Sequence, residues 1–229
     1  MRSMSRKAKI IIVISAAVVV LLALCAHVSF HWTKEMTSCN STTTSSWSGT
    51  HEDRLRILHT IAIVAPRAKS ADVRLGDLIA DKLKEKLSSK PLARDVRRGD
   101  HSWTSRNPEV TVYQSAAAAN RAKADFYLTI EPKQYRYSFW PFARNWNAKV
   151  SVYGSPAGVH TGPMLVEGSN DGFIDIGMEF DYSGRIIGIF TPSYLTSKVA
   201  EEIAKKVVDE IEQKADTLVN EFLNRKKED

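Results

Sequence analysis

The chain has 229 residues, 43% of them hydrophobic, and carries a formal net charge of +6 with a pI near 9.3. Four basic residues before position 10 supply +4 of this charge, so everything after Lys9 nets only +2. The basicity is therefore a membrane-topology signal, and we expect no nucleic-acid partner. The length is enough for one ordinary domain with its own core.

Residues 10–30 (IIIVISAAVVVLLALCAHVSF) carry no formal charge. A helix of this length, at about 1.5 Å per residue, is roughly as long as a bilayer core is thick. We interpret it as a retained transmembrane anchor, with the basic tail 1–9 in the cytoplasm. A cleaved secretory signal is the alternative, but its apolar core is usually about 7–15 residues and ends in a small-x-small site. Cys25 follows the bulky Leu24, which disfavours lipoprotein acylation.

Residues 31–54 are interpreted as a flexible Ser/Thr-rich linker. The run 37–50 (TSCNSTTTSSWSGT) is mostly small and polar, so it buries too little apolar area to offset its ordering entropy. Cys25 lies in the anchor and Cys39 in the linker, which leaves the folded part without a disulfide framework or a Cys-based zinc site. A homo-oligomer is possible through Cys39 pairing with a second chain, although an idle thiol is the preferred interpretation.

An extracytoplasmic α/β domain is expected over residues 55–224, followed by a charged tail, 225–229. Apolar residues that recur every four positions predict an amphipathic helix from Ser70 to Pro91 and a long one over 194–223. An alanine-rich helix is expected at 115–124.

Strands are predicted from β-branched runs and period-two alternation at 57–65, 109–114, 126–130 with a continuation past Pro132, 146–153 and 163–168. The basic stretch 93–107 is expected to be irregular, and 169–192 is ambiguous. The predicted fold class is therefore α/β (α+β): a transmembrane helix, then one domain with a mixed sheet of about five strands, two shorter helices and a long C-terminal helix.

Three sequence runs carry a resemblance to a known superfamily: TIAIVAP at 60–66, LGDLIADKLKEKLSS at 75–89 and AAAANRAKADFYLTIEP at 116–132. With the element order, they make the chain similar to the envelope-protein superfamily of the curli-secretion lipoprotein, the penicillin-binding-protein activator lipoprotein and the N-terminal domain of TolB. The resemblance covers roughly residues 57–222. It implies this fold and a role in protein–protein contact in the envelope. The superfamily's usual lipidation site is absent.

An aromatic cluster around one expected hairpin is the main candidate for a partner surface. Aromatic and arginine side chains are enriched at protein interfaces. The alternatives are a core rim covered by the C-terminal helix and a tip that enters the membrane interface. The cluster comprises Tyr135, Tyr137, Phe139, Trp140, Phe142, Arg144 and Trp146.

Two charged groups have weaker functional interpretations. The basic stretch offers an anion-binding patch, against the preferred interpretation of a solvated loop; its members are Arg94, Arg97, Arg98, His101 and Arg106. An acidic group could hold calcium, which takes oxygen ligands, although a solvated loop is again preferred. Its members are Asn170, Asp171, Asp175, Glu179 and Asp181.

We expect no catalytic residue, no cofactor and no metal site, because no nucleophile elbow, P-loop, dinucleotide fingerprint or metal-spaced histidine pair is present. The expected function is a non-enzymatic binding or assembly protein of the bacterial envelope, held in the inner membrane by residues 10–30. Its domain would dock onto a partner protein in the periplasm or outside the cell. The alternatives are an accessory subunit of lipid or lipopolysaccharide transport, and a membrane-tethered hydrolase that uses carboxylates between Asp171 and Asp181.

Overall fold

The structure is a computed structural model, and it describes residues 6–29, 32–46, 54–65, 73–99, 101–140, 143–156, 173–187 and 193–224. The helices are α1 (Arg6–Ser29), α2 (Val73–Ser89), α3 (Ala116–Arg121) and α4 (Ser193–Asn224). The strands are β1 (Trp32–Ser41), β2 (Thr44–Ser46), β3 (Arg54–Ile57), β4 (Thr60–Val64), β5 (Ala93–Arg97), β6 (Ser102–Arg106), β7 (Glu109–Tyr113), β8 (Phe126–Trp140), β9 (Ala143–Ser155) and β10 (Phe173–Ile187).

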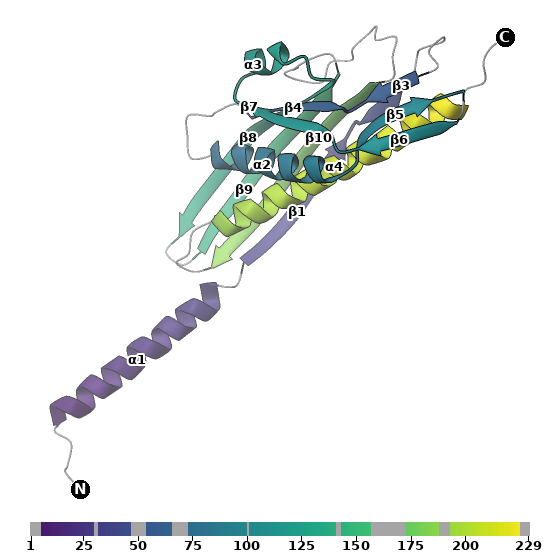
Figure 1. Cartoon of the computed structure of the whole chain (residues 1–229). Coiled ribbons are helices and arrows are strands. Elements are labelled where there is room, and N and C mark those ends of the chain that lie inside the picture. Colours follow the sequence, from purple (N-terminus) through teal and green to yellow (C-terminus); the bar gives the residue numbers. More distant parts are fainter. Residues whose placement is uncertain are drawn as a thin grey trace.

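These elements form two sheets within the described part of the chain (Figure 1). The large sheet has the order β1-β10-β9-β8-β4-β7, with β2 also paired to β10. Strand β4 runs parallel to β7 and β8, whereas the pairs from β8 to β1 are antiparallel. The small sheet is antiparallel, in the order β3-β5-β6. The predicted α/β class with a long C-terminal helix is confirmed.

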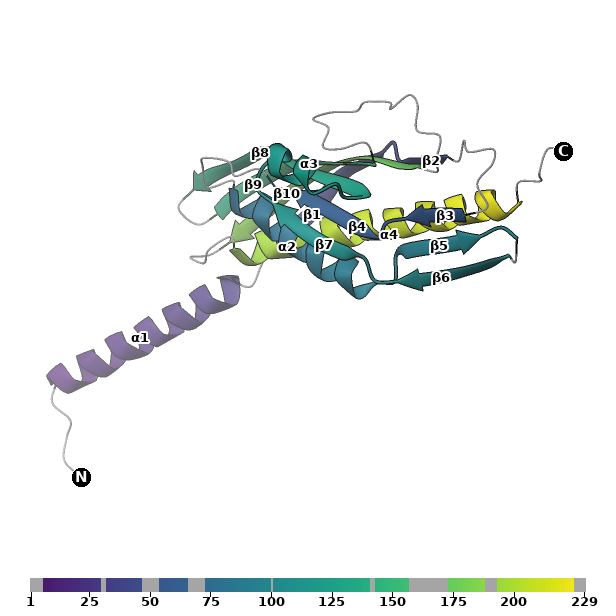
Figure 2. The same cartoon turned by 45° about the horizontal axis from the view of Figure 1, so that its top comes forward.

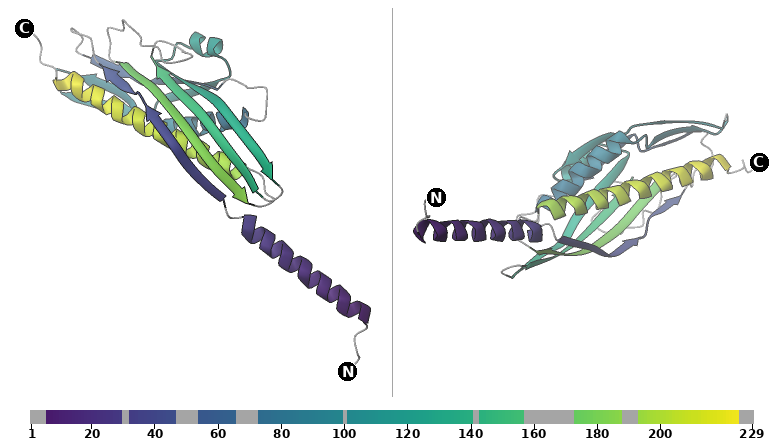
Figure 3. Two further views of the ribbon diagram at one scale, coloured as in Figure 1. Left: turned by 180° about the vertical axis from the view of Figure 1, so that it is seen from behind. Right: turned by 90° about the horizontal axis from the view of Figure 1, so that it is seen from below.

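Helices α2 and α4 cover one face of the large sheet, as Figure 3 shows from below. The predicted stripes explain why: Ile79, Leu83, Ile203 and Val207 are all fully buried, and their neighbours on the same helix faces join the same core. Strands β9 and β10 contribute every second residue to this core, because successive side chains of a strand point to opposite faces of the sheet. On the opposite face α3 packs near β4, where Ala119 is fully buried, and Thr129, Ser151 and Tyr153 on β8 and β9 are buried as well.

The segment expected to be a flexible linker is largely part of the large sheet, so that interpretation is wrong for residues 32–46. Strand β1 pairs with β10 over nearly its whole length, and the Thr42 amide donates to the Gly177 carbonyl at 2.8 Å. Composition misleads here because an edge strand is stabilised by its ladder of backbone hydrogen bonds, which needs little apolar burial. The domain therefore begins at Trp32, ahead of the expected boundary at residue 55.

Two further expectations differ from the structure. The basic stretch 93–107 is a hairpin, β5–β6, that belongs to the small sheet. The ambiguous stretch 169–192 contains β10, a fifteen-residue strand inside the large sheet. Its glycines obscured a period-two pattern in which Ile174, Ile176, Met178, Phe180 and Tyr182 are all buried. The strand expected at 163–168 lies outside the described residues.

Helix α1 extends away from the sheets at the N-terminal end of the chain (Figure 1). Judged on the residues that the structure describes, no helix meets the combined length and hydropathy requirement for crossing a membrane. The membrane anchor over residues 10–30 therefore stays a prediction.

Candidate functional site

The predicted aromatic partner surface is wrong at one of its residues. Trp146 is only 1% exposed and lies in the core under the helices. Its place in β9 explains this, because Ala148, Val150 and Val152 follow at alternate positions and are all buried on the same face. Trp146 thus follows the core-packing alternative and offers nothing to a partner.

The other members of that surface are placed only by their backbone. Strand β8 pairs Tyr135 with Ala148 and Tyr137 with Trp146, while Phe139 lies opposite Arg144. Trp140 closes β8 opposite Ala143, and Phe142 lies outside the described residues. The use of these residues as a partner surface stays a prediction.

The acidic group is organised by lysines on the outer face of the large sheet. Lys133 donates to Glu179 at 2.7 Å and to the Tyr153 hydroxyl at 3.3 Å, and Lys149 pairs with Asp181 at 2.8 Å. The hydrogen bond from Lys133 holds the pKa of Glu179 below its usual value. Glu179 is therefore ionised at neutral pH, the opposite of what a general acid needs.

No metal-ligand group occurs among the residues that the structure describes. Asp175 lies in β10, whereas Asn170 and Asp171 fall outside the described residues. Glu179 and Asp181 instead form ion pairs with lysines on other strands, which stabilise the sheet.

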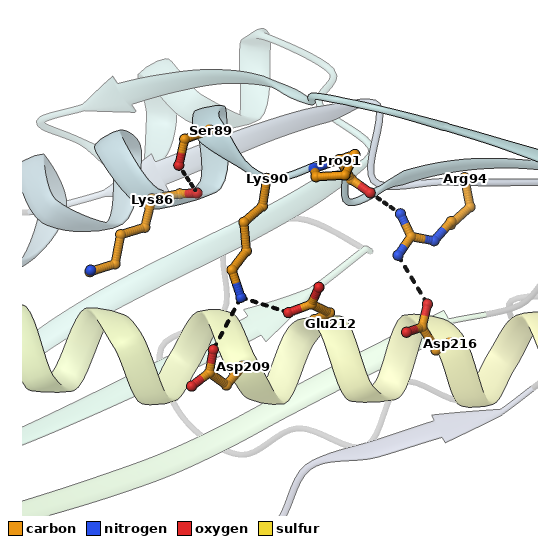
Figure 4. Close-up of polar contacts among 8 residues, drawn as sticks. All are labelled: Lys86, Ser89, Lys90, Pro91, Arg94, Asp209, Glu212 and Asp216. Atoms are coloured by element: carbon orange, nitrogen blue, oxygen red, sulfur yellow. Dashed lines mark hydrogen bonds and ion pairs between the residues drawn. The ribbon is translucent and has the colours of Figure 1, made fainter.

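A row of ion pairs links the segment after α2 to one side of α4 (Figure 4). Lys90 donates to Asp209 at 3.1 Å and to Glu212 at 2.6 Å. Arg94 donates to Asp216 at 3.0 Å, and the Arg94 side chain is only 5% exposed. The Lys90 pair raises the pKa of Lys90, chiefly through its hydrogen bond to Glu212. These contacts fix the start of the small sheet against α4.

Members of the proposed anion-binding patch are therefore used inside the protein. Arg94 also donates to the Pro91 carbonyl, and its guanidinium lies 5.2 Å from the centre of the Trp103 ring. Arg98 donates to the Phe222 carbonyl at 3.2 Å and stacks over the Phe222 ring at 4.5 Å. The patch is not a loop, and these two arginines are not available to bind an external anion.

His59 lies where the two sheets meet and is 5% exposed. Its Nδ1 accepts a hydrogen bond from Arg106 Nε at 3.1 Å, so the ring proton belongs on Nε2. Nε2 lies 3.3 Å from both the Arg94 carbonyl and an Asp95 carboxylate oxygen. The His59 amide donates to Asp125 at 3.1 Å. The sequence alone indicates no role for His59, because its partners come from distant segments.

Burial lowers the pKa of His59, and the nearby charges of Arg56 and Arg106 lower it further, while Asp95 works in the opposite direction. Protonation would also abolish the acceptor at Nδ1 on which Arg106 depends. The contacts at the junction between the sheets therefore favour the neutral form of the His59 imidazole.

The outer face of the small sheet carries three exposed arginines. Arg54 and Arg97 lie directly opposite each other on β3 and β5, and Arg56 lies next to them on the same face. All three are exposed. No acidic side chain of the described chain forms an ion pair with any of them. Like charges placed opposite each other on neighbouring strands are destabilising, so this face favours a bound anion.

No known protein family and no curated protein matches the sequence. Among solved structures, the chain is similar to the PelC dodecamer from Paraburkholderia phytofirmans, with 12% identity and a TM-score of 0.33, over 76% of this chain and 98% of that chain. A point variant of the same dodecamer gives a TM-score of 0.34 at 12% identity and the same coverage. A likeness this small carries no weight for fold or function, and the resemblance to the envelope-protein superfamily stays a prediction.

The ion pairs on α4 predict that two matched substitutions lower the free energy of unfolding by unequal amounts. Asp216→Asn leaves the buried Arg94 guanidinium without a counter-charge and is expected to lower the free energy of unfolding by about 1–2 kcal/mol. Asp209→Asn is expected to cost less than about 0.5 kcal/mol, because Lys90 keeps Glu212 and the pair is partly exposed. Urea unfolding followed by circular dichroism measures both; equal costs would contradict the assigned role of Arg94.

The His59 junction predicts a pH dependence. Because the folded pKa lies below the unfolded value of 6.5, the unfolded chain binds more protons in between. The contribution of neutral His59 to the free energy of unfolding is therefore fully present above pH 6.5. It falls as the pH drops below this value, by at most about 1.4 kcal/mol per pH unit. In urea unfolding at a series of pH values, His59→Asn is expected to remove this slope, whereas the exposed His101→Asn keeps it. An unchanged slope in His59→Asn would refute the assignment.

Proposed function

We propose that this chain is a membrane-anchored binding protein of the bacterial cell envelope. In this proposal α1 spans the inner membrane, the basic N-terminal tail lies in the cytoplasm, and the α/β domain faces the periplasm or the outside. The domain acts by docking onto a partner protein, and α1 raises its effective concentration near partners in or at the same membrane.

The observation that carries the proposal is an apolar helix that the rest of the described chain leaves uncovered. From Ile11 to Leu22 every side chain of α1 is exposed, and the nine large aliphatic ones are between 49% and 67% exposed. Leaving these groups in water costs on the order of 10 kcal/mol, which is comparable with the whole stability of a domain. A helix that is apolar on all sides needs a membrane or a protein core around it.

The domain itself supports binding at its outer surfaces. The space between the large sheet and α4, which a lipid-carrying groove would need, is filled by core side chains such as Val150, Phe180 and Ile211, each at most 1% exposed. The Lys133 hydrogen bond lowers the pKa of Glu179, so this carboxylate lacks the raised pKa that the hydrolase alternative would need. What the domain offers a partner is therefore its polar outer face and its small basic sheet.

The anchor predicts the behaviour of α1 variants. Replacing Val19 and Leu22 with arginine puts two charges within the proposed span, at about 2.5–3.5 kcal/mol each. The full chain is expected to float with phosphatidylcholine vesicles in a density gradient, and the double arginine variant is expected to stay in the dense fractions. The matched control, Val19→Leu with Leu22→Ile, should float like the unaltered chain. Flotation of the arginine variant, or a freely soluble unaltered chain, would contradict the anchor.

A further inference from the structure

The free edge of the small sheet combines three features that a binding strand would use. Strand β6 is the last strand of the order β3-β5-β6, so among the described residues its outer edge has no strand paired to it. All five of its residues are exposed, including Trp103 at 49%. An edge strand with unpaired backbone groups is a template for an added strand.

The described charges of the small sheet are mostly positive. Strands β3, β5 and β6 together carry five arginines against one aspartate, Asp95. Asp95 lies opposite Arg56 on this face, but its carboxylate is 3.3 Å from His59 Nε2, and among the described residues no carboxylate forms an ion pair with Arg54 or Arg97. An approaching segment is therefore favoured when it is acidic.

The register places this charge within reach of the edge. On β6, Ser102 pairs with Arg97, and Thr104 pairs with Asp95, so these small side chains stand between the outer-face charges and the free edge. The pairing also puts Arg106 on that face, and its guanidinium continues to His59. Neighbouring strands lie about 4.8 Å apart, so Arg97 can extend over Ser102 to a carboxylate on an added strand.

The face of β6 on the α4 side favours an apolar side chain on an added strand. Trp103 and Ser105 pair with Val96 and Arg94, the residues of β5 that face α4. One face of the Trp103 ring lies over the Arg94 guanidinium, and about half of the side chain is exposed. An apolar side chain on an added strand would pack against Trp103 there.

We infer that β6 accepts an extended acidic segment of a partner protein as a fourth strand of the small sheet. Alternate residues of that segment are acidic and reach Arg97, and the residues between them are apolar and cover Trp103. A second copy of this chain is a poor occupant, because pairing two β6 edges would bring two basic sheets together. This inference rests on the proposed role of the domain as a binding module, and is independent of whether α1 lies in a membrane.

The site lies at the far end of the molecule from α1. Figure 2 shows the small sheet beside the C-terminal half of α4, while α1 leaves the domain at the opposite end. Helix α4 has 32 residues, and at about 1.5 Å per residue it spans about 48 Å. A partner held at β6 would therefore be presented well away from the membrane that α1 is proposed to enter.

The test uses the full chain in a neutral detergent and a short fluorescent peptide of alternating glutamate and valine, with binding followed by fluorescence anisotropy. Saturable binding is expected, and it should weaken as salt is added. A peptide of the same sequence with every backbone nitrogen methylated keeps its charge but can donate no backbone hydrogen bond from either edge. Its affinity is expected to fall by more than about tenfold. A lysine–valine peptide should not bind.

Matched variants separate the site from general basicity. Arg97→Ser is expected to weaken peptide binding by about threefold, whereas Arg121→Ser, an equal charge change on α3, should leave it unchanged. Absent binding, equal binding of the methylated peptide, or equal losses in both variants would overturn the inference. So would inorganic polyphosphate displacing the peptide as well as the unlabelled peptide does. None of these outcomes alters vesicle flotation, so a failure here is distinguishable from a failure of the anchor.

Discussion

The packing of α4 on the inner face of the large sheet is the interaction on which the rest of the structure depends. Its apolar stripe, which includes Val199, Ile203, Val207 and Ile211, is fully buried against alternating side chains of the central strands and against α2. The same helix continues past the large sheet to contact β3 and β5, and Asp216 holds Arg94 there. One helix therefore joins both sheets, and with α2 it covers the apolar face that the sheet presents.

This coverage determines what is left to bind anything else. The inner face is closed, so the surfaces that remain are a polar outer face with cross-strand lysine–carboxylate pairs, a small basic sheet with a free edge, and the exposed helix α1. The two apolar helices differ in kind. Helix α4 has one apolar side, which the sheet covers, whereas α1 is apolar all round and no described face of the domain covers it. The proposed function follows from that contrast.

The sequence predicted the helices well because their signal is local. Leucines and isoleucines spaced by four residues gave α2 and α4 within a few residues of their ends. Strand β1 was missed because its stability comes from backbone pairing with β10, about 140 residues away along the chain. The His59 junction could not be predicted, since its partners lie 35 to 66 residues distant and only the fold brings them together. Trp146 was grouped with the neighbouring aromatic residues of the expected hairpin, although it shares its strand face with Ala148, Val150 and Val152, which the helices cover.

The most direct test of the proposed anchor measures whether α1 is surrounded by lipid or by water. With Cys25 and Cys39 replaced by serine, a single spin label at Val19→Cys or at Gly99→Cys can be placed on the full chain in phosphatidylcholine vesicles. Power saturation then compares collisions with oxygen, which concentrates in lipid, and with a water-soluble nickel complex. If α1 spans the bilayer, collisions with oxygen dominate at position 19 and collisions with the nickel complex dominate at position 99, in the hairpin between β5 and β6. A label at position 19 that meets the nickel complex, or is shielded from both reagents, would contradict it.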